Sequence, residues 1–181
     1  MSENLITRTI SGFVTGHDGW QILREAAESA AALPEGKIVL KLESWQAFKG
    51  ELAERAARGE IGAWLSADEE PQALAEDFSR LGLIAVDFPI FRDGRGYSTA
   101  VLLRTRLGWK GPLRAIGDVL RDQLLHMVRC GFDSYALRPD QDARAALTAF
   151  NEMSIRYQGT VLDPLPLFRR ERAQAAAGAQ A

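Results

Sequence analysis

The chain has 181 residues, of which 46% are hydrophobic and 25% are charged. This composition is typical of a globular protein and excludes a disordered chain, while the length predicts one domain. The formal net charge of −2 argues against nucleic acid as a partner. The single cysteine excludes an intrachain disulfide and a cysteine-based metal cluster, and the presence of only two histidines argues against a multi-histidine metal site.

The N-terminal segment does not have the pattern of a secretory signal, in which a basic region precedes an apolar core. The longest apolar stretch lies near residues 81–86, far short of the roughly 20 residues that a membrane helix needs. We therefore expect a cytoplasmic protein with a reduced thiol and no membrane partner.

Residues 1–36 give a mixed signal. Trp20, Leu23, Ala26 and Ala27 fall at helical spacing, and residues 34–36 predict a turn. From there on, strand-like and helical segments alternate. Apolar segments predict five strands and a candidate sixth, at residues 38–42, 61–65, 83–88, 113–116, 132–137 and 154–158.

Apolar residues at helical spacing predict a helix after each strand. Candidate N-terminal caps are Ser66 or Asp68, then Asp118 and Asp140, and Gly131 is placed to end a helix. This alternation predicts an α/β fold of five or six βα units with a mainly parallel sheet. A complete (β/α)8 barrel needs eight units, so we expect an open sheet or a partial barrel. Residues 1–166 are predicted to form this single domain, and residues 167–181 a mobile tail.

Ligands of parallel α/β sheets bind beyond the carboxyl ends of the strands. The loops predicted there carry the candidate catalytic residues Asp87, Asp93, Arg95 and Asp118. Glycines in the longest loop allow positive φ and close backbone approach, and a helix N-terminus follows, so a sulfate-like or phosphate-like anion fits there. The candidate anion-binding residues are Arg92, Gly94, Arg95, Gly96, Tyr97 and Arg138. The alternative is a plain turn in which Arg95 pairs with a nearby carboxylate.

Residues 91–114 form a basic segment in an acidic chain. The only acidic residue there is Asp93, whereas the basic residues are Arg92, Arg95, Arg104, Arg106, Lys110 and Arg114. Such a segment can steer an acidic partner or an anionic ligand. The alternative is the solvated face of an amphipathic helix.

Two further groups of residues are candidates for chemistry. Asp118, Asp122 and His126 recur every four residues and would share one helical face, as a metal site or acid–base pair would require, but capping is the simpler role for Asp118. Cys130 follows at the end of that helix, where a raised thiol pKa favours packing over redox chemistry. The sequence predicts neither a bound metal nor a cofactor, since no cofactor motif is present.

Three segments in fixed order carry a family resemblance: 88–98 (FPIFRDGRGYS), 113–124 (LRAIGDVLRDQL) and 129–133 (RCGFD). From about Ile38 to Phe150, the chain resembles the bacterial family catalogued as domain of unknown function 934. The resemblance implies genes placed beside those of the sulfite reductase haemoprotein, and an oxidoreductase involved in sulfite reduction. The family offers no established catalytic residues to transfer.

We therefore expect an accessory or subunit-like protein in assimilatory sulfite reduction, within sulfur assimilation and cysteine biosynthesis. Its expected partner is a sulfite reductase haemoprotein or another sulfur-assimilation protein. One alternative is an α/β enzyme that binds a small anion at its strand-end loops. Another is a non-catalytic module that forms a homo-oligomer.

Overall fold

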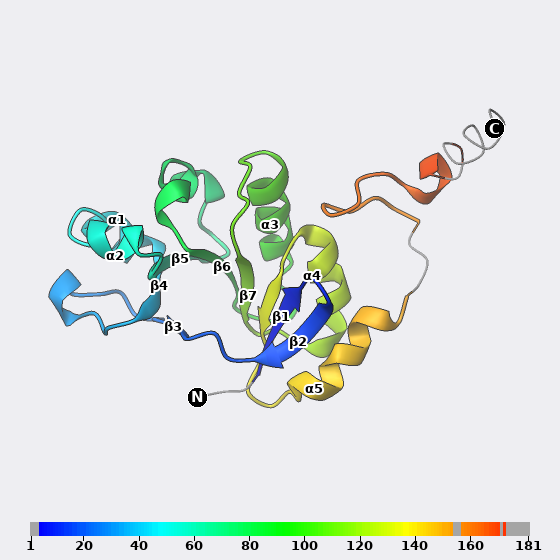
Figure 1. Cartoon of the computed structure of the whole chain (residues 1–181), viewed down its shortest axis with the longest axis horizontal. Coiled ribbons are helices and arrows are strands. Elements are labelled where there is room, and N and C mark those ends of the chain that lie inside the picture. The colour runs from blue at the N-terminus through cyan, green and yellow to red at the C-terminus, as the bar shows by residue number, and fades with distance from the viewer. Residues whose placement is uncertain (1–3, 154–156, 171, 173–181) are drawn as a thin grey trace.

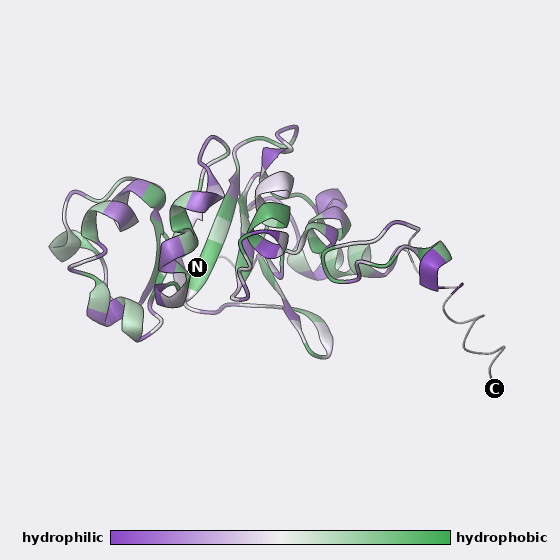
Figure 2. Cartoon of the chain, turned by 90° about the horizontal axis from the view of Figure 1, so that it is seen from above, coloured by the Kyte–Doolittle hydropathy of each residue, from purple (hydrophilic) through white to green (hydrophobic). Residues whose placement is uncertain are grey.

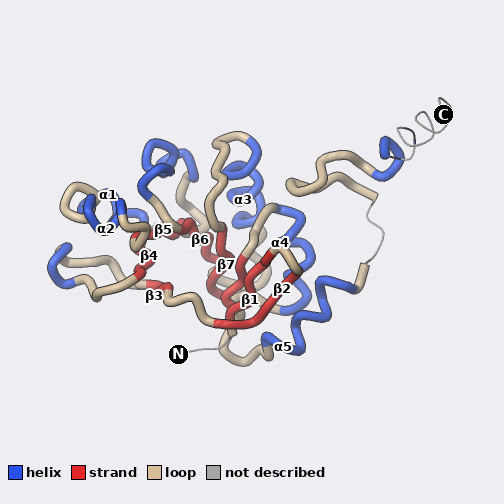
Figure 3. The backbone as a smooth tube through the Cα atoms, in the orientation of Figure 1, coloured by secondary structure: helices blue, strands red, loops and turns tan. Residues whose placement is uncertain are grey.

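A computed structural model describes residues 4–153, 157–170 and 172 of the chain. The α/β class is confirmed: eight strands form one mixed sheet that curls into a half-barrel, with helices around its outer side (Figures 1 and 3). Residues 154–156 of the candidate sixth strand lie outside the described residues, as do residues 171 and 173–181 of the predicted tail.

The eight strands are β1 (Leu5–Thr9), β2 (Gly12–Gly16), β3 (Trp20–Ile22), β4 (Lys37–Lys41), β5 (Ile61–Leu65), β6 (Leu83–Phe88), β7 (Leu113–Gly117) and β8 (Ser134–Ala136). Their order across the sheet is β2-β1-β8-β7-β6-β5-β4-β3. Neighbouring strands from β3 to β8 are parallel, whereas β1 runs antiparallel to both β2 and β8.

The labelled α-helices are α1 (Leu42–Phe48), α2 (Ala53–Ala57), α3 (Arg95–Thr105), α4 (Leu124–Cys130) and α5 (Ala143–Ala146). Residues 167–170 are helical as well. The 3₁₀ segments are η1 (Ala30–Ala32), η2 (Pro71–Arg80), η3 (Arg121–Gln123) and η4 (Leu147–Asn151). The helix predicted after the strand at residues 61–65 is thus the 3₁₀ segment η2 and not an α-helix. Among the described residues, none of the helices combines the length and apolar character that a membrane crossing requires.

Side-chain alternation along the strands produces two apolar layers. On the outer face, residues such as Leu40, Val86 and Ala115 pack against the helices. On the concave face, Val39, Leu83 and other residues form a smaller cluster of their own. Strands covered on both faces read as continuous apolar runs. For that reason the predicted strands 61–65 and 83–88 match β5 and β6, and the central strands are strongly hydrophobic in Figure 2.

The helical interpretation of residues 20–27 is wrong. Trp20 and Ile22 lie in strand β3 and pack against the concave cluster, with the Trp20 ring beside Gly82. The preceding hairpin of β1 and β2 was also missed. Residues 17–19, which connect β2 to β3, cross the open side of the half-barrel (Figure 1), where Asp18 contacts Arg114 of β7. These strands form through contacts with distant parts of the sheet, which local spacing does not encode.

One of the predicted helix caps is confirmed, and others are wrong. Gly131 is confirmed as the C-terminal cap of α4, with a φ of 101°. Asp142, rather than Asp140, caps α5 by accepting hydrogen bonds from the backbone of Arg144 and Ala145. The residue flanking η2 is Glu70, which makes no side-chain cap, so neither Ser66 nor Asp68 has that role.

Candidate functional site

The strand-end residues lie along one edge of the half-barrel, because β6, β7 and β8 are parallel neighbours whose carboxyl ends meet there. Residues 89–94 connect β6 to α3, and we call them the rim loop. Asp87 and Asp118 lie at the ends of the adjacent strands β6 and β7, and the backbone N–H of Asp118 donates to the Phe88 carbonyl at 2.7 Å. Arg138 follows β8.

Arg95 is paired with two carboxylates. Its Nε donates to Asp93 Oδ1 at 3.0 Å and its Nη2 to Asp93 Oδ2 at 2.6 Å, while its Nη1 contacts Asp68. Asp93 also accepts the backbone N–H of Arg95, the first residue of α3. These bonds to Arg95 lower the pKa of Asp93 to about 2. The Asp93 carboxylate therefore occupies the helix N-terminus at which the sequence predicts an external anion, and the anion site stays a prediction.

Arg138 is held in the same manner. Its Nη1 donates to Asp118 Oδ1 at 2.7 Å, and its Nε donates to Asp140 Oδ1 at 2.6 Å. The bond from Arg138 is the main cause of the lowered pKa of Asp140. Asp118 Oδ2 accepts the backbone N–H of Phe91 at 2.7 Å. The capping role expected of Asp118 is therefore wrong: its carboxylate joins the rim loop to Arg138 instead.

The remaining predicted residues are dispersed around this edge. Asp87 pairs with Arg24 at 2.5 Å, and Arg92 is exposed. Neither Gly94 nor Gly96 has the positive φ expected of it. Gly96 is needed for close approach, because a Cβ atom there would lie 2.8 Å from Phe88 Cζ. Tyr97 packs its ring on Phe88 at 5.1 Å between centroids.

The structure thus forms three ion-paired groups, around Arg95, Arg138 and Arg24, and no described contact joins Arg95 directly to Arg138. Each guanidinium already faces its own carboxylates, so charge at this edge is largely neutralised pair by pair. What this arrangement does is fix the conformation of the rim loop.

Sequence reasoning missed the exposed apolar tip of that loop. The side chains of Ile90 and Phe91 are 45% and 48% exposed. Their backbone is held from below: besides the bond to Asp118, the Phe91 carbonyl accepts from Gln123 Nε2 at 3.3 Å, and Asp93 N–H donates to the Ile90 carbonyl at 3.0 Å. An apolar pair after a strand resembles core in a sequence, so only the folded chain reveals its exposure.

The basic segment 91–114 is not one continuous surface. The Arg104 guanidinium is turned inward, where it donates to the carbonyls of Trp109, Gly111 and Gly131. Arg114 is buried on the concave face of β7. Four of the six cations are exposed: Arg92, Arg95, Arg106 and Lys110.

His126 and Cys130 lie one turn apart on α4, with Nε2 and Sγ 3.8 Å apart. Asp118 precedes η3 and does not share their helical face, which corrects the predicted trio. The described residues contain no cluster of three or more histidine, cysteine or acidic side chains suited to a metal ion. Burial raises the pKa of Cys130 to about 11 and lowers that of His126.

We expect the Cys130 thiol to react with iodoacetamide at pH 8 about 100-fold more slowly in the native chain than in urea, because thiolate is the reactive form. A pKa near 11 leaves almost no thiolate at pH 8, whereas an unfolded cysteine, with a pKa of about 8.5, is partly ionised. Mass spectrometry of timed samples measures both rates. Equal rates in the two states would contradict the assigned burial.

The family comparison matches residues 62–168 to the model described as bacterial protein of unknown function (DUF934). Searches of curated proteins and of solved structures found no match to the chain. The matched region runs from β5 through the rim loop to the segment after η4, and includes all three sequence motifs of the resemblance. The chain therefore belongs to this family of bacterial proteins of unknown function.

Proposed function

We propose that this chain is an accessory, subunit-like protein of assimilatory sulfite reduction that binds a sulfite reductase haemoprotein, or another sulfur-assimilation protein, through the rim loop. The partner comes from the family resemblance, which implies genes beside that haemoprotein. The observation that carries the proposal is the exposed pair Ile90 and Phe91 on a loop whose backbone is already fixed.

Preorganisation of the rim loop supports this role. Binding costs less conformational entropy when a loop is ordered before the partner arrives. Interface hot spots are enriched in aromatic residues and arginine, with polar groups around them. Phe91 and Arg92 provide this combination, and the paired charges of Arg95 and Arg138 surround it.

In this role the chain acts in the cytoplasm, and its five or six strand–helix units bring their loops together at this edge. Redox chemistry then belongs to the partner, because the single thiol of this chain is buried and protonated at neutral pH. In this role the rim is a docking surface, and Asp87, Asp93, Arg95 and Asp118 act by positioning rather than by catalysis.

The test is to co-express the chain with the cognate sulfite reductase haemoprotein and to measure binding by calorimetry. We expect Phe91→Ser to weaken binding at least tenfold, the scale of an interface hot spot, with an unchanged melting temperature. The matched control is Ile10→Ser, a fully exposed side chain on the β1–β2 turn, for which no change in binding is expected.

Two outcomes would refute the proposal. One is the absence of binding between wild-type chain and haemoprotein. The other is equal affinity of the wild-type and Phe91→Ser chains. If light scattering instead shows a homo-oligomer that Phe91→Ser dissociates, in a chain that does not bind the haemoprotein, the rim loop belongs to the alternative oligomerisation module.

A further inference from the structure

The concave face of the half-barrel has an apolar cluster, but one row of its side chains is polar. The strand registers pair Thr7 of β1 with Ser134 of β8, and Ser134 with Arg114 of β7. Three neighbouring strands thus place the hydroxyls of Thr7 and Ser134 and the guanidinium of Arg114 side by side. The next row along the same strands is apolar, with Leu5, Ala136 and Ile116.

Arg114 is the charged group of this row, and only some of its N–H donors form hydrogen bonds. The side chain is 4% exposed. Its Nε donates to Ser134 Oγ at 3.1 Å, and its Nη2 contacts Asp18. Among the described residues, none accepts a hydrogen bond from Nη1. Since Nη1 is not one of the described side-chain atoms that are fully buried without a partner, it remains accessible and can donate to a bound ligand.

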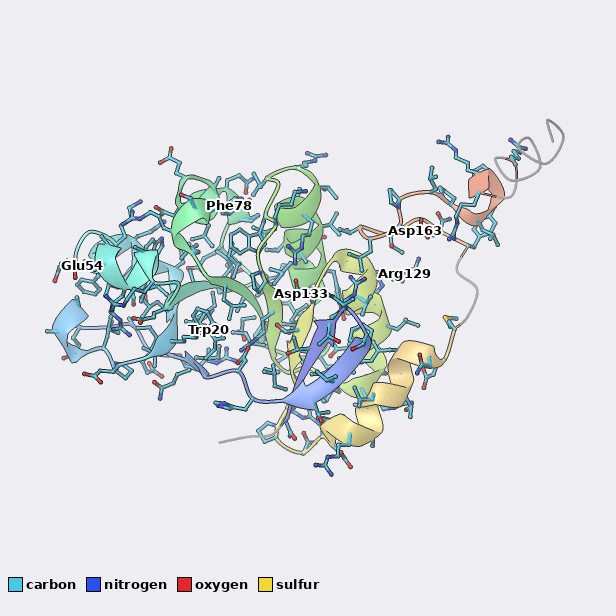
Figure 4. All side chains as sticks on the ribbon, in the orientation of Figure 1. Trp20, Glu54, Phe78, Arg129, Asp133 and Asp163 are labelled. Atoms are coloured by element: carbon cyan, nitrogen blue, oxygen red, sulfur yellow. The ribbon has the colours of Figure 1, made fainter. Side chains whose placement is uncertain are left out.

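A cavity of about 640 Å³ lies against this row, at the amino end of β7. Its walls include Thr7, Arg8, Lys110, Arg114 and Ser134, and also Trp20 and Asp133, which Figure 4 labels. The volume is within the usual range for small-molecule sites. A second hollow of about 480 Å³ adjoins it, and Asp18, Trp20 and Arg114 line both.

The charges around the cavity favour an anion. Two carboxylates line it, and each already has its own partners. Asp18 contacts Arg114 and the backbone N–H of Trp20, whereas Asp133 accepts from Arg104 and from the Leu113 N–H. Lys110 and Arg8 are exposed, and neither forms an ion pair with a described residue. Arg8 and Lys110, together with Arg114, therefore line one cavity.

From this arrangement we propose that the cavity binds a small divalent oxyanion between Arg8, Lys110 and Arg114, with Thr7 and Ser134 as additional hydrogen-bonding groups. Guanidinium and ammonium groups are the usual donors to sulfate and phosphate oxygens. Sulfate, sulfite and phosphate share this chemistry. The site lies on the concave face, away from the rim loop, and the inference does not rest on the proposed function.

The test is to titrate the full chain with sodium sulfate, sulfite and phosphate in separate calorimetry experiments, with ionic strength held constant by sodium chloride. We expect saturable binding of at least one anion, and the ranking of the three identifies its source. Because replacement of the buried Arg114 can prevent folding, the exposed Arg8→Ala and Lys110→Ala variants, alone and combined, carry the test.

The doubly substituted chain should bind the preferred anion at least tenfold more weakly than wild type. The matched control is Arg106→Ala, another exposed cation, which does not line the cavity and should leave the affinity unchanged. The proposal is overturned if none of the three anions shows saturable binding. It is equally overturned if the double variant and the Arg106→Ala control bind with the same affinity.

Discussion

Replacing Arg104 with methionine should lower the free energy of unfolding by about 3 kcal/mol, the scale for breaking a buried ion pair. Arg104 is 13% exposed and donates to three backbone carbonyls and to Asp133. These acceptors belong to the turns before β7 and β8, so one side chain fixes both strand entries. Methionine keeps the apolar stem but leaves every acceptor without its donor.

The effect on Asp133 makes this loss larger. Burial already raises the pKa of its carboxyl group, and Arg104 and the Leu113 N–H oppose that rise. Without the cation, the folded chain holds a buried carboxylate with one stabilising contact fewer. Urea denaturation at pH 7, monitored by tryptophan fluorescence, measures the difference from wild type.

Arg106→Met is the matched control, because Arg106 directly follows the same helix and is exposed. Its substitution should change the free energy of unfolding by at most about 0.5 kcal/mol, as is usual at surface positions. If the free energy of unfolding fell equally in both variants, the stabilising role of the inward-facing Arg104 would be refuted. The basic segment would then be a surface feature, as its sequence alone indicates.

The basic segment 91–114 shows which features of the fold can be predicted from the sequence and which cannot. The strands β5 and β6 were predictable because they are buried on both faces, and their apolar runs are continuous. The direction of a charged side chain is different, since it depends on which acceptors the fold brings within reach. Arg104 and Arg106 are two residues apart, yet only Arg104 meets the turn carbonyls.

The candidate site was predictable to a similar extent. A parallel sheet brings its strand ends to one edge, so the sequence could gather Asp87, the rim loop, Asp118 and Arg138 there. It could not assign their partners, because Asp68, Asp140 and Arg24 lie in loops whose positions depend on tertiary packing. The concave polar row was missed for a related reason: Thr7, Ser134 and Arg114 meet only through strand register.

Gly117→Ala should lower the free energy of unfolding by about 3 kcal/mol, from two separate costs. Gly117 has a φ of 94°, and placing an L-residue in the left-handed region costs about 1–2 kcal/mol. A Cβ atom there would also lie 2.4 Å from the Phe88 carbonyl oxygen and 2.6 Å from Asp87 Oδ1. Relieving such overlap by backbone shifts costs typically about 1–3 kcal/mol.

Gly108→Ala separates the two costs, because Gly108 also has a positive φ, 78°, but open space around its Cβ position. The free energy of unfolding of the Gly108→Ala chain should fall only by the conformational cost, about 1 kcal/mol. Equal losses in the two variants would show that β6 does not approach Gly117 closely. A larger loss at Gly117 would instead support that close approach, because there the backbone hydrogen bond between Asp118 and Phe88 joins the two strand ends. The same bond positions the Asp118 carboxylate under the rim loop, so the Gly117→Ala chain should also bind the haemoprotein more weakly than the Gly108→Ala chain.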